Sequence, residues 1–372
     1  MNETQFLQQL IQIDSINPPG NESRMANFLA KRCEAIGMPF EIQRVDNGRS
    51  NFLLQIKGKT PKKLFFCGHM DTVSPGEMQW EYPPLSGEIV GNRMYGRGAS
   101  DMKSGLAAMY LAIESIFLEN IIPHHTLVFL ATAGEEVDSC GARVFLESHQ
   151  LADVEAMIIG EPTNGKVVIG HKGALWLDIT TYGKTAHGSM PDKGINAIEK
   201  MTKVIQLIEK LKLEWIYTTE TLGKSSMAVT TIQGGVQTNV IPDSCSITVD
   251  IRTVPPQSHQ DIFEKLTLHL KQLSQNEPNF SFDLKKRLDR PSIFTDKKSS
   301  IIQKALKLNN FKNEECYGVS YYTDAAVLNP NSSIPTLIYG PGDESLAHQP
   351  NEWVDIDAYQ KSIEFYRKLM LE

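Results

Sequence analysis

The sequence predicts an α/β fold in which a smaller α+β domain is inserted into a larger, discontinuous domain. Three observations favour this organisation. Short apolar runs alternate with helical patterns before Gly173 and again after Asp296. Between these positions the pattern changes to β-α-β-β-α-β. The 372 residues are also enough for about two domains.

The first part of the chain alternates between helices and strands. Amphipathic spacing predicts the helices, and short apolar runs bounded by polar or glycine residues predict the strands. The predicted helices span 3–13, 22–36 and 104–120, and the predicted strands span 51–57, 64–67, 126–132 and 156–160. Pro18, Pro19 and Gly20 separate the first two helices. Strands that are apolar throughout suit a mainly parallel sheet covered on both faces.

The inserted unit begins where the pattern changes, near Gly173. Its predicted strands span 174–182, 226–234, 244–253 and 280–284, and its predicted helices span 196–213 and 259–273. This order is ferredoxin-like. Residues 287–296 return to the larger domain, which continues with a helix at 300–308, a strand at 336–339 and a final helix from Asp357. We therefore expect residues 1–172 and 286–372 to form one domain and residues 173–285 to form the other.

Charge and cysteine content narrow the class of protein. Lys and Arg number 37 and Asp and Glu number 44, a formal net charge of −7 that argues against binding to nucleic acid or anionic lipid. Five scattered cysteines without a CxxC pair favour a reducing compartment. The first residues lack the basic end and apolar run of a signal peptide, and no stretch approaches the roughly 20 apolar residues of a membrane span. We expect a cytoplasmic protein without a membrane or nucleic-acid partner.

Histidine and carboxylate side chains follow the apolar runs, and functional sites of α/β sheets gather at the carboxyl ends of strands. His69 and Asp71 come after the run at 64–67. One residue apart, they point the same way in an extended chain, so Asp71 could hold the ring of a metal-binding His69. A strand-end turn with two solvated polar side chains would explain the pair equally well.

Asp101 stands in a glycine-rich turn directly before the helix predicted at 104–120. Such a turn can bind phosphate at a helix N-terminus. Asp101, however, replaces the third glycine of the dinucleotide fingerprint, and its charge would repel phosphate. Asp101 is therefore either a metal ligand or an N-cap of the helix.

Glu135 and Glu136 follow the strand predicted at 126–132, and Glu161 follows the strand predicted at 156–160. Two adjacent carboxylates beside a buried strand are costly unless a cation or hydrogen bonds compensate them. One could bind a metal ion while its neighbour acts as a base, whereas exposed glutamates in turns are the alternative. His348 lies in a loop between turn residues, where functional histidines often lie.

Together these segments supply two histidines and several carboxylates, an oxygen-rich set that fits zinc, cobalt or manganese. Two metal ions roughly 3.5–4 Å apart would form a hydrolytic centre.

These segments also resemble a known superfamily. The sequences HMDTV, GRGASDMKSGLAA, TAGEEVDSCGA, IIGEPTN and AHQPNE occur in family order along nearly the whole chain. They are similar to those of the co-catalytic zinc deacylases and exopeptidases, which include succinyl-diaminopimelate desuccinylase, acetylornithine deacetylase, aminoacylase and glutamate carboxypeptidase. The resemblance implies a zinc-peptidase-like catalytic domain with a mixed sheet. It also implies an inserted ferredoxin-like lid and dimerisation domain, and a homodimer.

The resemblance implies two zinc ions and a role for each candidate at the metal centre. Asp101 would bridge the ions, and the peptide bond after it would be cis. His69 and Glu161 would complete one metal site, and Glu136 and His348 the other. The resemblance further implies that Glu135 is the general base and acid and that Asp71 orients His69.

Three residues of the inserted domain match the family's substrate contacts. His187 would reach the site of the other subunit. Asn239 and Arg252 would contact the substrate carboxylate, although a strand-edge charge is the alternative for Arg252.

The activity implied is removal of the acyl group from an N-acyl-L-amino acid by zinc-activated water, with cobalt or manganese as possible substitutes for zinc. The nearest named activities are N-succinyl-diaminopimelate desuccinylase and N-acetylornithine deacetylase, of lysine and arginine biosynthesis. Thr323, Asp324 and Ala325 stand where the desuccinylase usually carries a TSDGRF-like stretch, which weakens the expectation of diaminopimelate as substrate. A dipeptidase or carboxypeptidase is the first alternative. A non-catalytic binding protein on the same scaffold is the second, and the presence of Glu135 argues against it.

Overall fold

The computed structural model describes residues 1–309 and 315–372, which form two compact units. The first unit comprises 1–170, 294–318 and 323–372, and the second comprises 171–293 and 319–322. The chain returns to the first unit later than the expected residue 286. The reason is that β14 (Ser281–Arg290) is longer than the strand predicted at 280–284 and pairs with β9 (Gly173–Tyr182) as far as Ala174.

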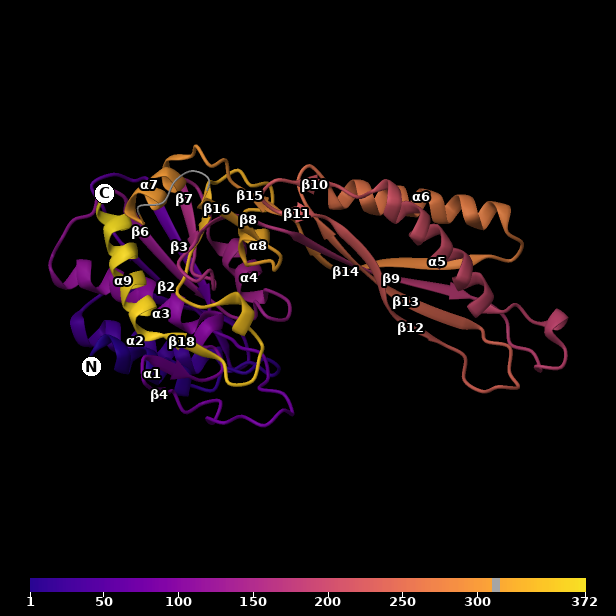
Figure 1. Cartoon of the computed structure of the whole chain (residues 1–372), viewed down its shortest axis with the longest axis horizontal. Coiled ribbons are helices and arrows are strands. Elements are labelled where there is room, and N and C mark those ends of the chain that lie inside the picture. Colours follow the sequence, from indigo (N-terminus) through magenta and orange to yellow (C-terminus); the bar gives the residue numbers. More distant parts are fainter. Residues whose placement is uncertain (310–314) are drawn as a thin grey trace. The chain divides into compact units, whose positions relative to one another are not determined.

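The first unit is built on a mixed sheet, which confirms the predicted α/β class (Figure 1). The strands are β1 (Phe40–Asp46), β2 (Arg49–Ile56), β3 (Lys63–His69), β6 (Thr126–Thr132), β7 (Val154–Ile159), β8 (Val167–His171), β15 (Ile293–Phe294), β16 (Cys316–Val319) and β17 (Thr336–Ile338). Their order is β1-β2-β6-β3-β7-β17-β8-β15, and β16 pairs with β8. The adjacent strands β6, β3, β7 and β17 are parallel. Antiparallel pairing of β1 with β2, β2 with β6 and β17 with β8 makes the sheet less parallel than expected.

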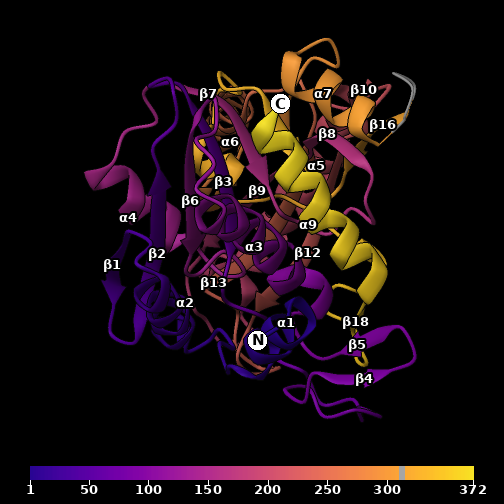
Figure 2. The ribbon, with the colours of Figure 1, turned by 90° about the vertical axis from the view of Figure 1, so that its left-hand side faces the viewer.

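Helices cover both faces of this sheet. One face packs against α1 (Glu3–Gln12), α2 (Glu22–Ile36), α3 (Ser104–Leu118), α7 (Ser300–Leu308) and α9 (Ile356–Leu371). Figure 2 shows α3 and α9 side by side across it. On the other face lie the shorter α4 (Cys140–Ser148) and α8 (Ala325–Leu328), which contact each other.

Two adjacent phenylalanines of β3 show why both faces are covered. Successive side chains of a strand point to opposite faces. Phe65 lies against Phe145 of α4, with ring centroids 5.6 Å apart. Phe66 lies against Tyr366 of α9, at 6.3 Å. Each ring therefore anchors a different helix layer to the strand that ends at His69.

The second unit has the predicted β-α-β-β-α-β order. Its main elements are β9, α5 (Ala197–Glu214), β12 (Ser226–Gly234), β13 (Ser244–Thr253), α6 (His259–Asn276) and β14, and a short hairpin joins β10 (Thr218–Thr219) to β11 (Gly223–Lys224). The antiparallel order is β12-β13-β9-β14. Alternate residues of β9 and β13, such as Leu177 and Val249, pack with α5 and α6 in one core. Both helices therefore lie on the same face, and β12 is an edge strand.

The start of α3 approaches the end of β7 so closely that only glycine fits at position 105. A β-carbon there would lie 1.8 Å from the carbonyl oxygen of Gly160, the residue before Glu161. Because the contact is with a backbone atom, a change of side-chain rotamer cannot relieve the clash. Gly105 thus fixes the distance between the helix that follows Asp101 and the strand that precedes Glu161.

We expect Gly105→Ala to destabilise the protein by about 2–3 kcal/mol, because overpacking against backbone forces the helix away from the sheet. The urea midpoint would measure the loss. Ser104→Ala is the matched control. The Ser104 hydroxyl is buried without a hydrogen-bond partner among the described residues, so its removal should change stability by less than about 0.5 kcal/mol. Equal midpoints for Gly105→Ala and the wild type would contradict the packing argument.

Candidate metal centre

The four parallel strands end at the same edge of the sheet and deliver most of the candidate side chains there. His69 is the last residue of β3, and Glu135 and Glu136 lie just after β6. Glu161 follows β7 and His348 lies in the loop after β17. Because β6, β3, β7 and β17 are neighbours in the sheet, residues far apart in sequence meet at one place.

Asp101 reaches this edge from an irregular turn, 99–103, that leads into α3. The N-cap alternative is wrong, because α3 begins only at Ser104 and Lys103 occupies the cap position. The Asp101 side chain is instead within hydrogen-bond distance of His69. The Asp101–Met102 peptide bond is cis, as the resemblance implies.

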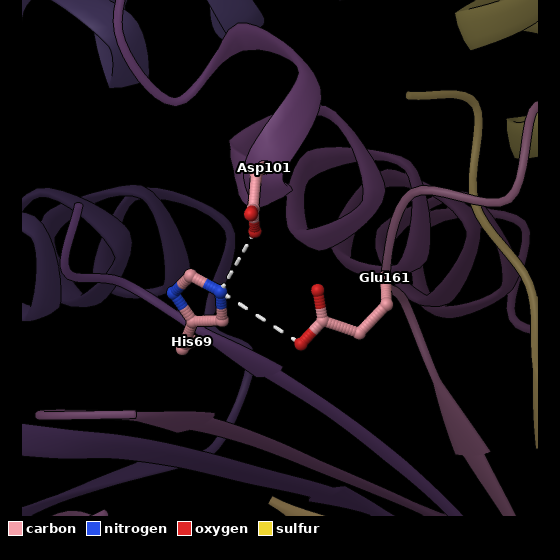
Figure 3. Close-up of side chains that lie close together, drawn as sticks. All are labelled: His69, Asp101 and Glu161. Atoms are coloured by element: carbon pink, nitrogen blue, oxygen red, sulfur yellow. Dashed lines mark hydrogen bonds and ion pairs between the residues drawn. The ribbon is translucent and has the colours of Figure 1, made fainter. Parts of the chain in front are cut away.

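The five candidate ligands form two clusters that share Asp101. In the first, His69 Nε2 lies 3.2 Å from Asp101 Oδ1 and 3.8 Å from Glu161 Oε1 (Figure 3). In the second, His348 Nε2 lies 3.0 Å from Glu136 Oε2 and 3.5 Å from Asp101 Oδ2. Within each cluster one ligand atom from each residue lies within 4.8 Å of the others. Each oxygen of the Asp101 carboxylate thus faces a different cluster.

The electrostatics of the clusters fit bound cations. Burial raises the pKa values of Glu135, Glu136 and Glu161 above the usual range, and the neighbouring carboxylates raise them further. Burial would lower the pKa of His69, but the charges of Glu161 and the surrounding carboxylates raise it well above its usual value. The buried Oε1 atoms of Glu135 and Glu136 find no hydrogen-bond partner among the described residues. Divalent cations would relieve this repulsion and use the unpaired oxygens, so the residues fit a metal pair.

Glu135 lies next to the clusters and is only 6 % exposed. In the part of the chain that the structure describes, its side chain belongs to neither three-residue metal cluster. A carboxylate whose pKa is raised by burial is suited to accept and return a proton near neutral pH.

Asp71 acts on His69 through a different atom from the one expected. The ring Nδ1–H of His69 donates to the main-chain oxygen of Asp71 at 2.9 Å, whereas the carboxylate oxygen Oδ1 is 3.6 Å away. The carbonyl bond leaves Nε2 free to face Asp101 and Glu161. The Asp71 carboxylate instead accepts hydrogen bonds from the backbone N–H groups of residues 134, 135 and 136.

Glu352 holds the Asp101 turn by accepting backbone hydrogen bonds, as Asp71 does for residues 134–136. Glu352 was not among the residues predicted from the sequence. Its carboxylate accepts hydrogen bonds from the backbone N–H groups of Gly98, Ser100 and Asp101, and from Arg97 Nη1 at 2.5 Å. Glu352 is fully buried. Its place in the AHQPNE segment was the only available signal, and spacing alone does not show that the side chain turns inward.

Asp324 is a further buried carboxylate beside the centre. The Thr132 hydroxyl donates to Asp324 Oδ2 at 2.6 Å, which ties α8 to the end of β6. Burial raises the pKa of Asp324, while the Thr132 hydrogen bond opposes the shift. Its charge in turn raises the pKa values of Glu135 and Glu161.

The three candidates of the second unit do not form one cluster within it. His187 and Asn239 are exposed neighbours, since Gly188 N–H donates to the Asn239 carbonyl and His187 pairs with Val240. Arg252 lies near the C-terminal end of β13, whereas Asn239 precedes the strand. The Arg252 side chain forms a bidentate ion pair with Asp250.

The chain is similar to known proteins in both sequence and fold. Residues 65–372 match the model of peptidase family M20/M25/M40. A probable succinyl-diaminopimelate desuccinylase of Staphylococcus aureus is 30% identical over 99% of this chain and 96% of its own length. An acetylornithine deacetylase of Photorhabdus laumondii is 34% identical over 95% and 92%. The crystal structure of an M20 family metallo-carboxypeptidase from Sulfolobus solfataricus superposes with a TM-score of 0.80 at 20% identity, covering 100% of this chain and 99% of the other.

The chain therefore belongs to peptidase family M20/M25/M40. It is a hydrolase acting on amide bonds, which confirms the expected class of enzyme and sets aside the non-catalytic alternative. Among the described residues, no helix is both long and apolar enough to cross a membrane.

We expect a divalent cation such as Zn²⁺ to stabilise the protein more strongly as pH rises from about 5.5 to 7.5. The folded-state pKa values of Glu136 and Glu161 are raised above the unfolded value of about 4.3. Ion-free protein therefore loses stability as pH rises through these folded values. Bound cations would remove that loss by compensating the charge of the deprotonated carboxylates, whereas at lower pH they must first displace the protons. The measurement is the increase in Tm on adding the ion at each pH.

Glu161→Gln should flatten this pH dependence, because it removes a carboxylate whose pKa is raised and, with it, one proposed metal ligand. The exposed Asp153→Asn is the control and should leave the slope unchanged. An ion-induced Tm increase that stays constant or declines with pH would contradict the assignment of these carboxylates as ligands.

Proposed function

We propose that this M20 hydrolase binds two zinc ions and removes the acyl group from an N-acyl-L-amino acid. The observation that carries the proposal is the position of Asp101, whose two oxygens face two separate histidine–carboxylate clusters. One carboxylate placed between two such clusters suits a bridging ligand of a dinuclear centre. The proposed ligands are His69, Asp101, Glu136, Glu161 and His348.

The chemistry divides between the metal ions and Glu135. A bound metal pair would lower the pKa of water and polarise the scissile carbonyl. Glu135 accepts a proton from the attacking water as the oxygen–carbon bond forms. It then returns the proton to the amine nitrogen as the carbon–nitrogen bond breaks. Asp71 and Glu352 hold the loops that carry Glu135 and Asp101.

The choice of a deacylase over a peptidase rests on the two relatives, a probable desuccinylase and a deacetylase that match nearly the whole chain. Succinyl-diaminopimelate and acetylornithine, of lysine and arginine biosynthesis, are therefore the first candidate substrates. A dipeptidase or carboxypeptidase is the second candidate, since the similar solved structures include a metallo-carboxypeptidase. Both reactions break an amide next to a carboxylate, and we propose that Arg252 contacts that carboxylate by exchanging its pairing with Asp250.

We also propose a homodimer, because the substrate contacts of one chain lie too far apart to meet. Arg252 is near the end of β13, whereas His187 and Asn239 lie beyond its first residue, Ser244. At about 3.3 Å per residue, the stretch from Ser244 to Arg252 alone spans about 26 Å. A small substrate bound by Arg252 of one subunit would need His187 and Asn239 from another. The exposed edge of β12 offers a surface for such pairing.

A cytoplasmic location is consistent with the state of the thiols. All five cysteines are free. Burial raises the pKa of Cys140 to about 12 and that of Cys33 to about 11, which makes these two thiols poorly reactive.

The substrate proposal is tested by amine release from N-succinyl-diaminopimelate, N-acetylornithine and a dipeptide, using protein loaded with Zn²⁺ or Co²⁺. We expect a higher kcat/KM for an N-acyl amino acid than for the dipeptide. Glu135→Gln should lower kcat by about 10²–10⁴ while both metal ions stay bound, because it removes the proton carrier and no ligand. Preferred dipeptide turnover would favour the peptidase, and undiminished activity of Glu135→Gln would show the base assignment to be wrong.

The dimer proposal predicts complementation between two variants that are each nearly inactive. Mixing His187→Ala with Glu135→Gln under subunit exchange should restore up to about a quarter of wild-type activity. Half of the dimers would be mixed, and each would hold one complete site. Light scattering should show twice the 41.6 kDa chain mass. A fully active monomer, or a mixture no more active than its parents, would refute a role for His187 in the other subunit's site.

A further inference from the structure

The loop of residues 134–136 carries the proposed base and a proposed ligand, and its three backbone N–H groups all donate to one side chain. The N–H groups of Gly134 and Glu135 donate to Asp71 Oδ1 at 3.0 and 3.1 Å. The N–H group of Glu136 donates to Asp71 Oδ2 at 3.2 Å. Consecutive N–H groups that converge on a carboxylate form an anion-binding concavity. The orientation of the Asp71 carboxylate therefore determines where Glu135 and Glu136 point.

Asn17 contributes a fourth hydrogen bond that helps to hold this orientation. Its Nδ2 group donates to Asp71 Oδ2 at 2.9 Å. Asp71 is fully buried and Asn17 is 4 % exposed, so water does not replace this donor readily. The amide is the only side-chain donor that bonds this carboxylate among the described residues, since the other three bonds come from backbone N–H groups.

The backbone around Asn17 is itself tied to the segment that carries Asp71. Asn17 N–H donates to the Thr72 carbonyl at 2.8 Å, and Thr72 N–H donates to the Ser15 carbonyl at 3.1 Å. The Ser15 hydroxyl donates to the Met70 carbonyl at 2.7 Å. Residues 15–17 thus run alongside residues 70–72, and the Asn17 amide has little freedom to leave Asp71.

We propose that Asn17 is a positioning residue for catalysis. It holds the Asp71 carboxylate so that the 134–136 loop presents Glu135 to the scissile amide and Glu136 to His348. The kinetic part of this inference rests on the proposed function, whereas the structural part does not. An amide suits the position because it donates without charge. An aspartate there would place a second carboxylate at hydrogen-bond distance from Asp71.

The variants separate positioning from general stability. Asn17→Ala removes the donor, and Asn17→Asp replaces it with an acceptor of the same size. Asn17→Ser has a hydroxyl on a side chain too short to reach the Asp71 carboxylate. This variant takes the place of Asn17→Ala if Asn17→Ala does not fold. Asn21→Ala is the matched control in the same segment. Asn21 stands at the N-cap position of α2 but makes no side-chain cap bond.

The first measurement is hydrogen–deuterium exchange of the Zn²⁺-loaded protein. We expect amides 134–136 to exchange at least about tenfold faster in Asn17→Ala and faster still in Asn17→Asp, while α3 keeps its wild-type rates. Asn21→Ala should match the wild type throughout. Unchanged exchange at 134–136, or equal acceleration in α3, would overturn the proposal, since the residue would then be neutral or only generally stabilising.

The second measurement is steady-state kinetics on the best substrate of the panel. We expect kcat of Asn17→Ala to fall about 10–100-fold, with KM changed less than about threefold and two metal ions still bound per chain, because a small misplacement of the base slows chemistry more than binding. Wild-type kcat in Asn17→Ala would overturn the inference and leave the proposed function intact. Inactivity of the wild type on every substrate would overturn the proposed function, and the exchange measurement would still decide the role of Asn17.

Discussion

Hydrogen bonds from backbone N–H groups to two buried carboxylates hold the loops on which the metal centre depends. Glu352 accepts three such bonds from the turn that carries Asp101, and Asp71 accepts three from the loop that carries Glu135 and Glu136. Hydrogen bonds to an ionised acceptor are roughly twice as strong as neutral ones. Arg97 contributes a countercharge to Glu352, and removing one partner of a buried pair typically costs about 3–5 kcal/mol. Side-chain carboxylates thus hold both ligand loops in place, although neither loop is regular secondary structure.

These hydrogen bonds hold several carboxylates close together, although their mutual repulsion would otherwise push them apart. Asp101, Glu135, Glu136, Glu161 and Asp324 all lie at one edge of the sheet, and four of them have raised pKa values. Such a cluster is unfavourable for folding by itself. The large apolar core behind it, with α3 and α9 packed on the sheet, offsets that cost. The stability of the apolar core therefore allows the protein to fold with the charged site in place.

The sequence was most informative where local pattern decides the structure. The strand predicted at 126–132 and the helix predicted at 300–308 coincide with β6 and α7, and the polar residues after the parallel strands do meet at one edge. β1 was not predicted because its sequence, FEIQRVD, is not an apolar run. This agrees with its position, since every side chain of the strand is partly or fully exposed. Glu352 was not predicted because its partners Gly98, Ser100 and Asp101 lie about 250 positions earlier, and no local pattern encodes that contact. Asn17 was not singled out, because its proposed role depends on a contact with Asp71, 54 positions later, that no local pattern encodes.

The position of β17 has a consequence for the order in which the molecule can be assembled during synthesis. This strand, residues 336–338, lies between β7 and β8, which are made much earlier. A growing chain has His69, Asp101 and Glu161 long before it has His348 and Glu352. β17 cannot join β7 and β8 until residues 336–338 have emerged, so a chain released before them lacks His348 of the second cluster and Glu352, which holds the Asp101 turn.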